Sequence, residues 1–315
     1  MIKKKSSALG INRPLDEQDG ILYAIDPVDA TNWLDGAEYD EKHGVDLKGS
    51  SHLADVYLQY APEGNDLSIL EVGCGSGFLT IGLDAKSRIR QLVAVDISKK
   101  FLTQTRDRLP DYPNGRTTLL CGDVADPLLF DNGTFDAAFG NSLLHHIYDT
   151  EAFLIALKHA VRPGGSIVFS EPCQQGKSLV SFFCTAMLSA EAGNADTLFS
   201  DDEREKISAL LEIHKREEAV RHDQSLKLQW EDKHCFDTLE LKRLAQKLGF
   251  SKFDNFNTSR ISDGFRGEVE RTLKLMNVTK SLERFTWLFD AFQDEYVSMC
   301  EAHVQTPHQF LVFTH

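Results

Sequence analysis

The feature that most constrains the fold of this chain is an alternation of short β-rich runs with helical runs, which begins at Leu67. Strands that alternate with helices indicate βαβ units, because parallel neighbours need a crossover connection. The predicted strands are LSILEVG, QLVAVD, TTLLCGD, TFDAAFGN and SIVFSEP within residues 66–173, followed by SKFDNFN and HQFLVFT near the end of the chain. We therefore expect an α/β fold with a mostly parallel sheet and helices on both faces.

The rest of the chain divides around this predicted core, residues 66–173. Residues 1–65 are expected to form an N-terminal cap segment: a loose start over 1–20, irregular or helical chain over 21–48 with Tyr23, Trp33, Tyr39 and His43, and a helix over 50–60. Residues 174–235 break the alternation with helical patterns. Residues 236–315 return to the core, with a second helical insertion at 264–303.

Composition excludes several classes of protein. A formal net charge of −14 repels a phosphate backbone, so nucleic-acid binding is not expected. The longest uncharged apolar run, Ser178–Ala190, is too short to cross a bilayer, and the N-terminus lacks the apolar region of a signal peptide. The six cysteines form no CxxC pair, and without a secretory signal we expect reduced thiols and a cytoplasmic protein.

A glycine-rich loop, Glu71-Val72-Gly73-Cys74-Gly75-Ser76-Gly77, lies between a predicted strand and a predicted helix. Glycines let such a loop turn sharply and bring its backbone against a ligand, and the following helix offers free N–H groups. Asp96 ends the next strand, where its carboxylate could accept hydrogen bonds from ribose hydroxyls or could simply cap the next helix. Asp123 ends the third strand, where it could accept from an adenine amino group.

The main alternative for a glycine loop followed by an acid is a nicotinamide dinucleotide site. Its fingerprint, G-x-G-x-x-G, would require glycine where this chain has Phe78. Glu71 also does not suit a pyrophosphate site, because its negative charge would face that of the phosphates. A carboxylate there suits a cationic amino acid group instead.

In order and spacing, the segments EVGCGSG, VAVD, GDV, FDAAFGNSLLHHI and RPGGSIVFSEP resemble the class I S-adenosylmethionine-dependent methyltransferases of the type 11, small-molecule kind. The resemblance covers residues 66–172. It implies a Rossmann-like sheet of seven strands with an antiparallel last strand, for which 308–315 is the candidate. It also implies S-adenosylmethionine as cofactor. The implied cofactor-binding residues are Glu71, Gly73, Gly75 and Gly77 at the methionine end, Asp96 at the ribose, Asp123 and Val124 beside the adenine, and Asn141 beside the methyl donor. Ile97, next to Asp96, is a further cofactor-binding candidate.

Two histidines follow the fourth strand of the predicted core, in the run Asn141-Ser142-Leu143-Leu144-His145-His146. They are the best candidates for a catalytic base, needed only if the acceptor must lose a proton. Adjacent side chains of a strand or loop point in different directions, so we expect at most one to face the substrate. Both could instead only cap the next helix or brace the loop, and Glu171 is a further candidate. No metal-binding spacing is present, and we expect no metal.

These residues predict an enzyme that methylates an O, N or C atom of a small, apolar metabolite. The 174–235 insertion would be its lid, because it follows the fifth strand at the edge where ligands bind. Its apolar stripe could line a pocket or only pack the lid, and residues of 264–303 could form a homodimer surface. Two alternatives stay open: a methyltransferase of peptides, proteins or sugar chains, and a cofactor-binding protein without catalysis.

Overall fold

The computed structural model describes residues 9–28, 40–41, 47–192, 198–230, 232–258, 264–278, 282–292 and 306–315. The chain divides into two compact units. The core unit comprises residues 1–169, 243–254 and 311–315, and the helical unit comprises residues 170–242 and 255–310. Trp33, Tyr39 and His43 of the predicted cap segment lie outside the described residues.

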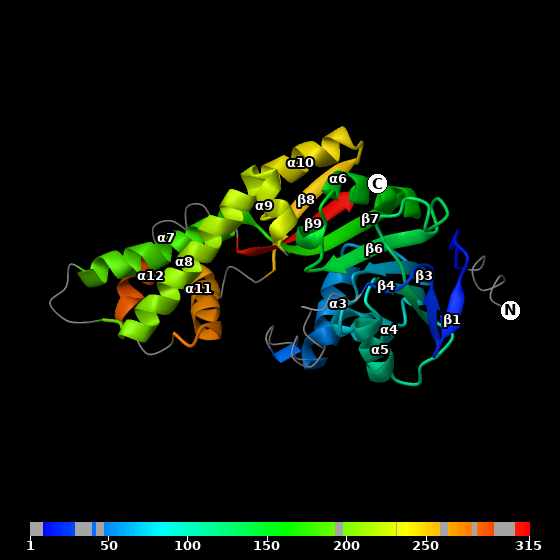
Figure 1. Ribbon diagram of the computed structural model, residues 1–315, viewed down its shortest axis with the longest axis horizontal. Coiled ribbons are helices and arrows are strands. Elements are labelled where there is room, and N and C mark those ends of the chain that lie inside the picture. The colour runs from blue at the N-terminus through cyan, green and yellow to red at the C-terminus, as the bar shows by residue number, and fades with distance from the viewer. Residues whose placement is uncertain are drawn as a thin grey trace. The chain divides into compact units, whose positions relative to one another are not determined.

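A nine-stranded sheet in the order β1-β2-β5-β4-β3-β6-β7-β9-β8 organises the fold (Figure 1). The four neighbouring pairs from β2 to β6 run parallel, which confirms the predicted mostly parallel sheet. The strands are β1 (Asp16–Gln18), β2 (Ile21–Tyr23), β3 (Leu67–Val72), β4 (Ile89–Asp96), β5 (Thr117–Cys121), β6 (Phe135–Asn141), β7 (Val161–Pro172), β8 (Lys252–Asn257) and β9 (His308–Thr314).

The last strand, β9, runs antiparallel to β7. Near the start of β7, the Gly164 N–H donates to the carbonyl of His315. Just after the end of β7, the Cys173 N–H donates to the carbonyl of Pro307. The two strands therefore run in opposite directions, and the predicted antiparallel last strand is confirmed.

The predicted strand number is wrong: the sheet has nine strands because the N-terminal segment adds β1 and β2. β1 pairs antiparallel with β2, and β2 pairs parallel with β5, placing Ile21 beside Leu119. Ile21 and Leu22 are buried. Strands of three residues are too short to show a period, so the sequence suggested loose or irregular chain here. They form because the exposed edge of β5 offers backbone partners.

Helices cover both faces of the sheet in the core unit: α3, α4 and α5 lie on one face and α6 on the other (Figure 1). Among the described residues, the helices up to α6 are η1 (Leu47–Gly49), α3 (Ser50–Leu58), α4 (Phe78–Asp84), α5 (Lys99–Arg108), η2 (Leu144–His146) and α6 (Thr150–Ala160). The helices described after α6 are α7 (Gln174–Ala192), α8 (Asp201–His222), α9 (Gln224–Gln229), α10 (Thr238–Lys247), α11 (Gly264–Leu275), η4 (Leu282–Phe285) and α12 (Thr286–Ala291). Ser98 caps α5: its hydroxyl oxygen accepts from the Phe101 N–H at 3.3 Å.

The helical unit has an apolar core of its own, built from α7, α8, α11 and α12. Phe183 stacks on Phe289 at 5.4 Å between ring centroids, and Phe199 stacks on Phe285 at 5.0 Å. Most of the predicted apolar stripe of α7 is used in this packing, whereas Phe182 is exposed. Among the described residues, no helix has both the length and the hydrophobicity needed to cross a bilayer.

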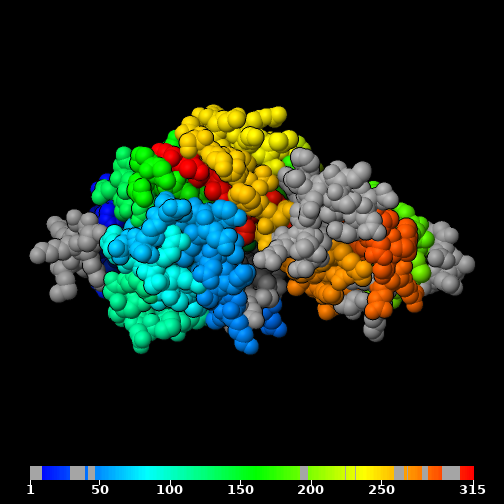
Figure 2. Space-filling model, turned by 180° about the vertical axis from the view of Figure 1, so that it is seen from behind, coloured from blue at the N-terminus to red at the C-terminus, as the bar shows by residue number. Residues whose placement is uncertain are grey.

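Helices α3 and α4 pack against each other through a glycine, and the light-blue and cyan parts of the chain that contain them adjoin on the face that Figure 2 shows. A Cβ atom at Gly82 would lie 2.1 Å from the backbone oxygen of Ser50, so Gly82→Ala must force the two helices apart. We expect a loss of about 1–3 kcal/mol of unfolding free energy, although alanine is the better helix former.

The matched control is Gly267→Ala in α11, where a Cβ would meet nothing within 4 Å. We expect this change to be neutral or to stabilise by up to about 1 kcal/mol. Urea unfolding of both variants tests the contrast, and equal effects would contradict the close contact of α3 with α4.

Candidate functional site

The carboxyl ends of the parallel strands bring the sequence-predicted residues to one edge of the sheet in the core unit. The glycine loop follows β3, Asp96 ends β4, Asp123 follows β5, and Asn141 ends β6. Because β5, β4, β3 and β6 are consecutive neighbours, these four positions form one row. This edge is where open α/β sheets bind ligands.

The glycine loop makes two contacts that leave no room for a side chain. Gly73, Gly75 and Gly77 all have positive φ angles, of 65°, 52° and 88°. A Cβ at Gly73 would lie 2.7 Å from Leu143 Cδ1, and one at Gly77 would lie 2.9 Å from the Thr105 side chain. Around Gly75, by contrast, a Cβ would meet nothing within 4 Å. The middle of the loop is therefore the part that is open to a ligand.

Asp96 ties the glycine loop to the next strand and helix. Its Oδ2 accepts from the Gly75 N–H at 2.9 Å, and its Oδ1 accepts from the Ser98 N–H at 2.9 Å. The carboxylate thus braces the glycine loop, a role that differs from the helix capping considered from the sequence. Each oxygen has a second lone pair, so the same group can also accept from ligand hydroxyls.

Glu71 is a buried carboxyl group with an unsatisfied oxygen. The residue is 2% exposed, and its Oε2 has no hydrogen-bond partner among the described residues. Burial, with a smaller contribution from the negative charge of Asp96, raises the pKa of Glu71 to about 8, although contact with Thr80 opposes the shift. A cationic ligand group would reverse the shift and would supply the missing partner.

Residues around β5 and the end of β4 complete this edge. The exposed Asp123 accepts from the Ala125 N–H at 2.9 Å, and Val124 beside it is half-buried. The backbone oxygen of Ile97 accepts from the Val28 N–H at 2.9 Å. The N-terminal segment therefore pairs with the chain that directly follows Asp96.

Asn141 is held by a residue that the sequence analysis placed only in a helix. The hydroxyl of Tyr57, in α3, lies 2.8 Å from the backbone oxygen of Gly140 and 3.3 Å from Asn141 Oδ1. Tyr57 is fully buried. Its position suits the apolar face of a helix, so only the structure shows its polar contact.

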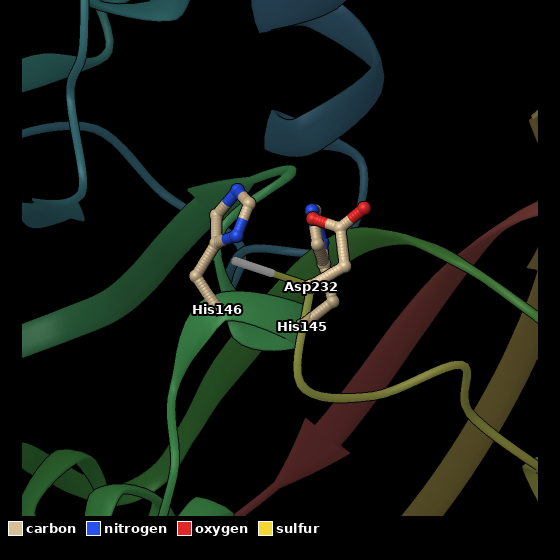
Figure 3. A group of neighbouring side chains, drawn as sticks. All are labelled: His145, His146 and Asp232. Carbon is tan, nitrogen blue, oxygen red and sulfur yellow. The ribbon is translucent and has the colours of Figure 1, made fainter. Parts of the chain in front are cut away.

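His145 and His146 both lie in η2, the short helix after β6, and Figure 3 shows their rings on the same side of it. Their ring centroids are 3.9 Å apart. The expectation that the two rings point in different directions is therefore wrong, because a tight 3-10 turn replaces the expected strand or loop. Asp232, also drawn in Figure 3, and Glu171 belong to the helical unit.

Three further residues shape this edge and carried no signal in the sequence. Thr105 and Arg108, in α5, donate to the backbone oxygens of Gly75 at 2.8 Å and Ser76 at 2.9 Å. Ser142 has a φ of 53°, which is rare for a residue with a side chain and turns the chain sharply after Asn141. Nothing in the apolar periodicity of the sequence marks a polar contact or a backbone angle.

The donor and acceptor groups of this edge fit S-adenosylmethionine. The unsatisfied oxygen of Glu71 suits the cationic amino group, the open face of Gly75 allows close approach to the backbone, and Asp96 suits the ribose. A dinucleotide fits less well, because its pyrophosphate would have to approach the acidic pair of Glu71 and Asp96.

Comparison with known proteins agrees with this assignment. Residues 70–169 match the family described as "Methyltransferase domain". An uncharacterized methyltransferase of Mycobacterium tuberculosis is 37% identical over 99 residues, which are 31% of this chain and 47% of that protein. Magnesium-protoporphyrin O-methyltransferase of Rhodobacter capsulatus is 30% identical over 126 residues, which are 39% of this chain and 53% of that protein.

A solved methyltransferase of Haloferax volcanii, in complex with a methyltransferase activator, is similar over 90% of this chain and 99% of its own. The TM-score is 0.51 and the identity 13%, so this likeness concerns the fold. The chain matches about half the length of the two curated relatives. The family match confirms the resemblance seen in the glycine loop and the acids that follow it.

Glu71 gives a pH-dependent prediction. With its pKa raised from 4.5 to about 8, the folded protein keeps a proton that the unfolded chain releases. Between about pH 5 and about pH 8, the unfolding free energy should therefore fall as pH rises, by up to about 1.4 kcal/mol per pH unit from this group. Glu71→Gln should remove that slope. Chemical unfolding of both proteins across this range measures the difference, and parallel curves would show that Glu71 titrates normally.

Proposed function

We propose that this chain, whose residues 70–169 belong to the class I S-adenosylmethionine-dependent methyltransferase family, transfers a methyl group from S-adenosylmethionine to an O, N or C atom of a small metabolite. The observation that carries the proposal is the joint placement of Glu71, Gly75 and Asp96 at one edge of the sheet. Glu71 keeps an unsatisfied buried oxygen there, and Asp96 fixes the open part of the glycine loop.

Each of these groups has a distinct task in the proposed reaction. Glu71 would hold the amino end of the cofactor, Asp96 its ribose, and Asp123 with Val124 its adenine. The cofactor brings a methyl group on a positively charged sulfur, already activated for displacement. The protein then has to orient the acceptor and exclude water.

His145 and His146 are proposed to accept the acceptor's proton. They follow Asn141 in the turn after β6, and two cationic rings 3.9 Å apart would repel each other. We therefore propose that only one ring of the pair becomes cationic. It does so by taking the acceptor's proton as the methyl group is transferred.

Three observations support a small acceptor and a cytoplasmic location. One relative is named for a small acceptor, magnesium protoporphyrin. Among the described cysteines, Cys74, Cys121, Cys173, Cys184 and Cys235 are free thiols, as in a reducing compartment. A formal net charge of −14 argues against a nucleic-acid substrate.

Calorimetric titration with S-adenosylmethionine, S-adenosylhomocysteine and NAD tests the cofactor. We expect the first two to bind and NAD not to bind. Asp96→Ala should weaken binding by about 1–3 kcal/mol, since it removes charge-assisted hydrogen bonds. Binding of NAD alone would overturn the proposal.

Asp136→Ala is the matched control for Asp96→Ala. Asp136, near the start of β6, also accepts from a backbone N–H, that of Ser68 at 2.7 Å, but at the opposite edge of the sheet. We expect its loss to lower stability and leave cofactor affinity unchanged. Equal losses of affinity in both variants would mean that Asp96 acts only as a brace.

The histidines are tested by turnover. With S-adenosylhomocysteine formation as the assay and small-molecule fractions as acceptors, His145→Gln or His146→Gln should lower turnover by about 100-fold or more at saturating cofactor, and leave cofactor affinity unchanged. If neither change lowers turnover, the pair only braces the loop. Cofactor binding with no transfer to any small-molecule fraction would contradict the proposed acceptor class.

A further inference from the structure

Two side chains of helix α5 donate hydrogen bonds to two consecutive backbone oxygens of the glycine loop. Thr105 Oγ1 donates to the oxygen of Gly75 at 2.8 Å, and Arg108 Nη1 donates to the oxygen of Ser76 at 2.9 Å. On the other side of the same loop, the Gly75 N–H donates to Asp96 Oδ2. Both peptide groups of Gly75 are thus fixed by side chains outside the loop.

Thr105 also fills the space that a glycine leaves. It is fully buried, and its side chain lies only 2.9 Å from the position that a Cβ atom at Gly77 would take. The contact and the hydrogen bond come from one side chain. Thr105 therefore contacts the loop on both sides of Ser76: its γ-oxygen donates to Gly75, and both its γ-oxygen and its γ-methyl group lie against Gly77.

Arg108 extends this arrangement to the N-terminal segment. Its Nη2 pairs with Asp40 Oδ2, to which Gln104 Nε2 also donates at 3.3 Å. Gln104 and Arg108 are four residues apart and lie on one face of α5. The glycine loop and Asp40 are thus joined through a single guanidinium group.

We propose that Thr105 and Arg108 are positioning residues that hold the glycine loop in the shape that binds the cofactor. They act through the loop: with both backbone oxygens drawn toward α5, the Gly75 N–H stays on Asp96 and the open face of Gly75 stays free for the ligand. The inference rests on the proposed function, because the affinity that it concerns is that for S-adenosylmethionine.

The test is calorimetric titration of the full chain with S-adenosylmethionine and S-adenosylhomocysteine. Thr105→Val keeps the shape of the side chain and removes its hydroxyl, and should weaken binding by about tenfold. Thr105→Ser restores the hydroxyl and should recover most of the affinity. Thr103→Val, the same change two residues away on α5, should leave binding unchanged.

A double-mutant cycle with Asp96→Ala, which removes the acceptor of the Gly75 N–H, separates positioning from general destabilisation. If Thr105 acts by keeping Gly75 on Asp96, the loss caused by Thr105→Val should largely disappear in the Asp96→Ala background. Additive losses, or wild-type affinity for Thr105→Val, would overturn the proposal.

Arg108→Lys provides the second variant if Thr105→Val does not fold. It keeps the charge but cannot donate to Ser76 and Asp40 in the same geometry, so affinity should fall by about threefold or more. Arg106→Lys on the same helix is its control and should bind like the wild type. Equal affinities of the two lysine variants would overturn the proposal. Failure of the wild type to bind S-adenosylmethionine would instead refute the proposed function.

Discussion

The hydrogen bond from the Gly75 N–H to Asp96 is the interaction on which the candidate site depends. It joins the loop after β3 to the end of β4. Asp96 also accepts a hydrogen bond from the N–H of Ser98, which precedes α5. Thr105 of α5 in turn donates to the backbone oxygen of Gly75 in the loop. The loop, the strand end and the helix are thus joined to one another by hydrogen bonds, which give a glycine-rich segment a defined shape.

Whereas the hydrogen bond between Gly75 and Asp96 stabilises the loop, the burial of Glu71 destabilises the protein in this structure. A buried carboxyl oxygen without a partner costs free energy, and a charged one costs more. Glu71 accordingly has a pKa raised to about 8 by its surroundings. Such a position is retained most readily where a ligand supplies the partner, and a cationic group at this point would turn the cost into affinity. The apolar surroundings that raise the pKa would also strengthen that ion pair.

The sequence predicted the core of the fold well because the regular part of the chain has a clear period. All seven predicted strands are present. Gly249, just past the end of α10, has a φ of 69°, the left-handed conformation in which a glycine commonly ends a helix. The two short strands β1 and β2 were missed, since pairing with β5 rather than local sequence creates them. Likewise, the positions of Glu71, Asp96 and Asn141 follow from the strand ends. The contacts of Tyr57, Thr105 and Arg108 depend on tertiary packing, which apolar spacing does not encode.

The same distinction explains the histidine pair. A sequence shows two adjacent histidines after a strand, but not the backbone angle that turns them. Ser142 takes the left-handed region at a cost of about 1–3 kcal/mol. This turn leads the chain from Asn141 into η2, while Leu143 packs where a side chain at Gly73 would lie. Leu143 therefore packs the turn that carries the proposed bases, His145 and His146, against the glycine loop that is proposed to bind the cofactor. A change in either loop would alter the other, so residues that touch neither ligand would still affect the alignment of methyl group and base.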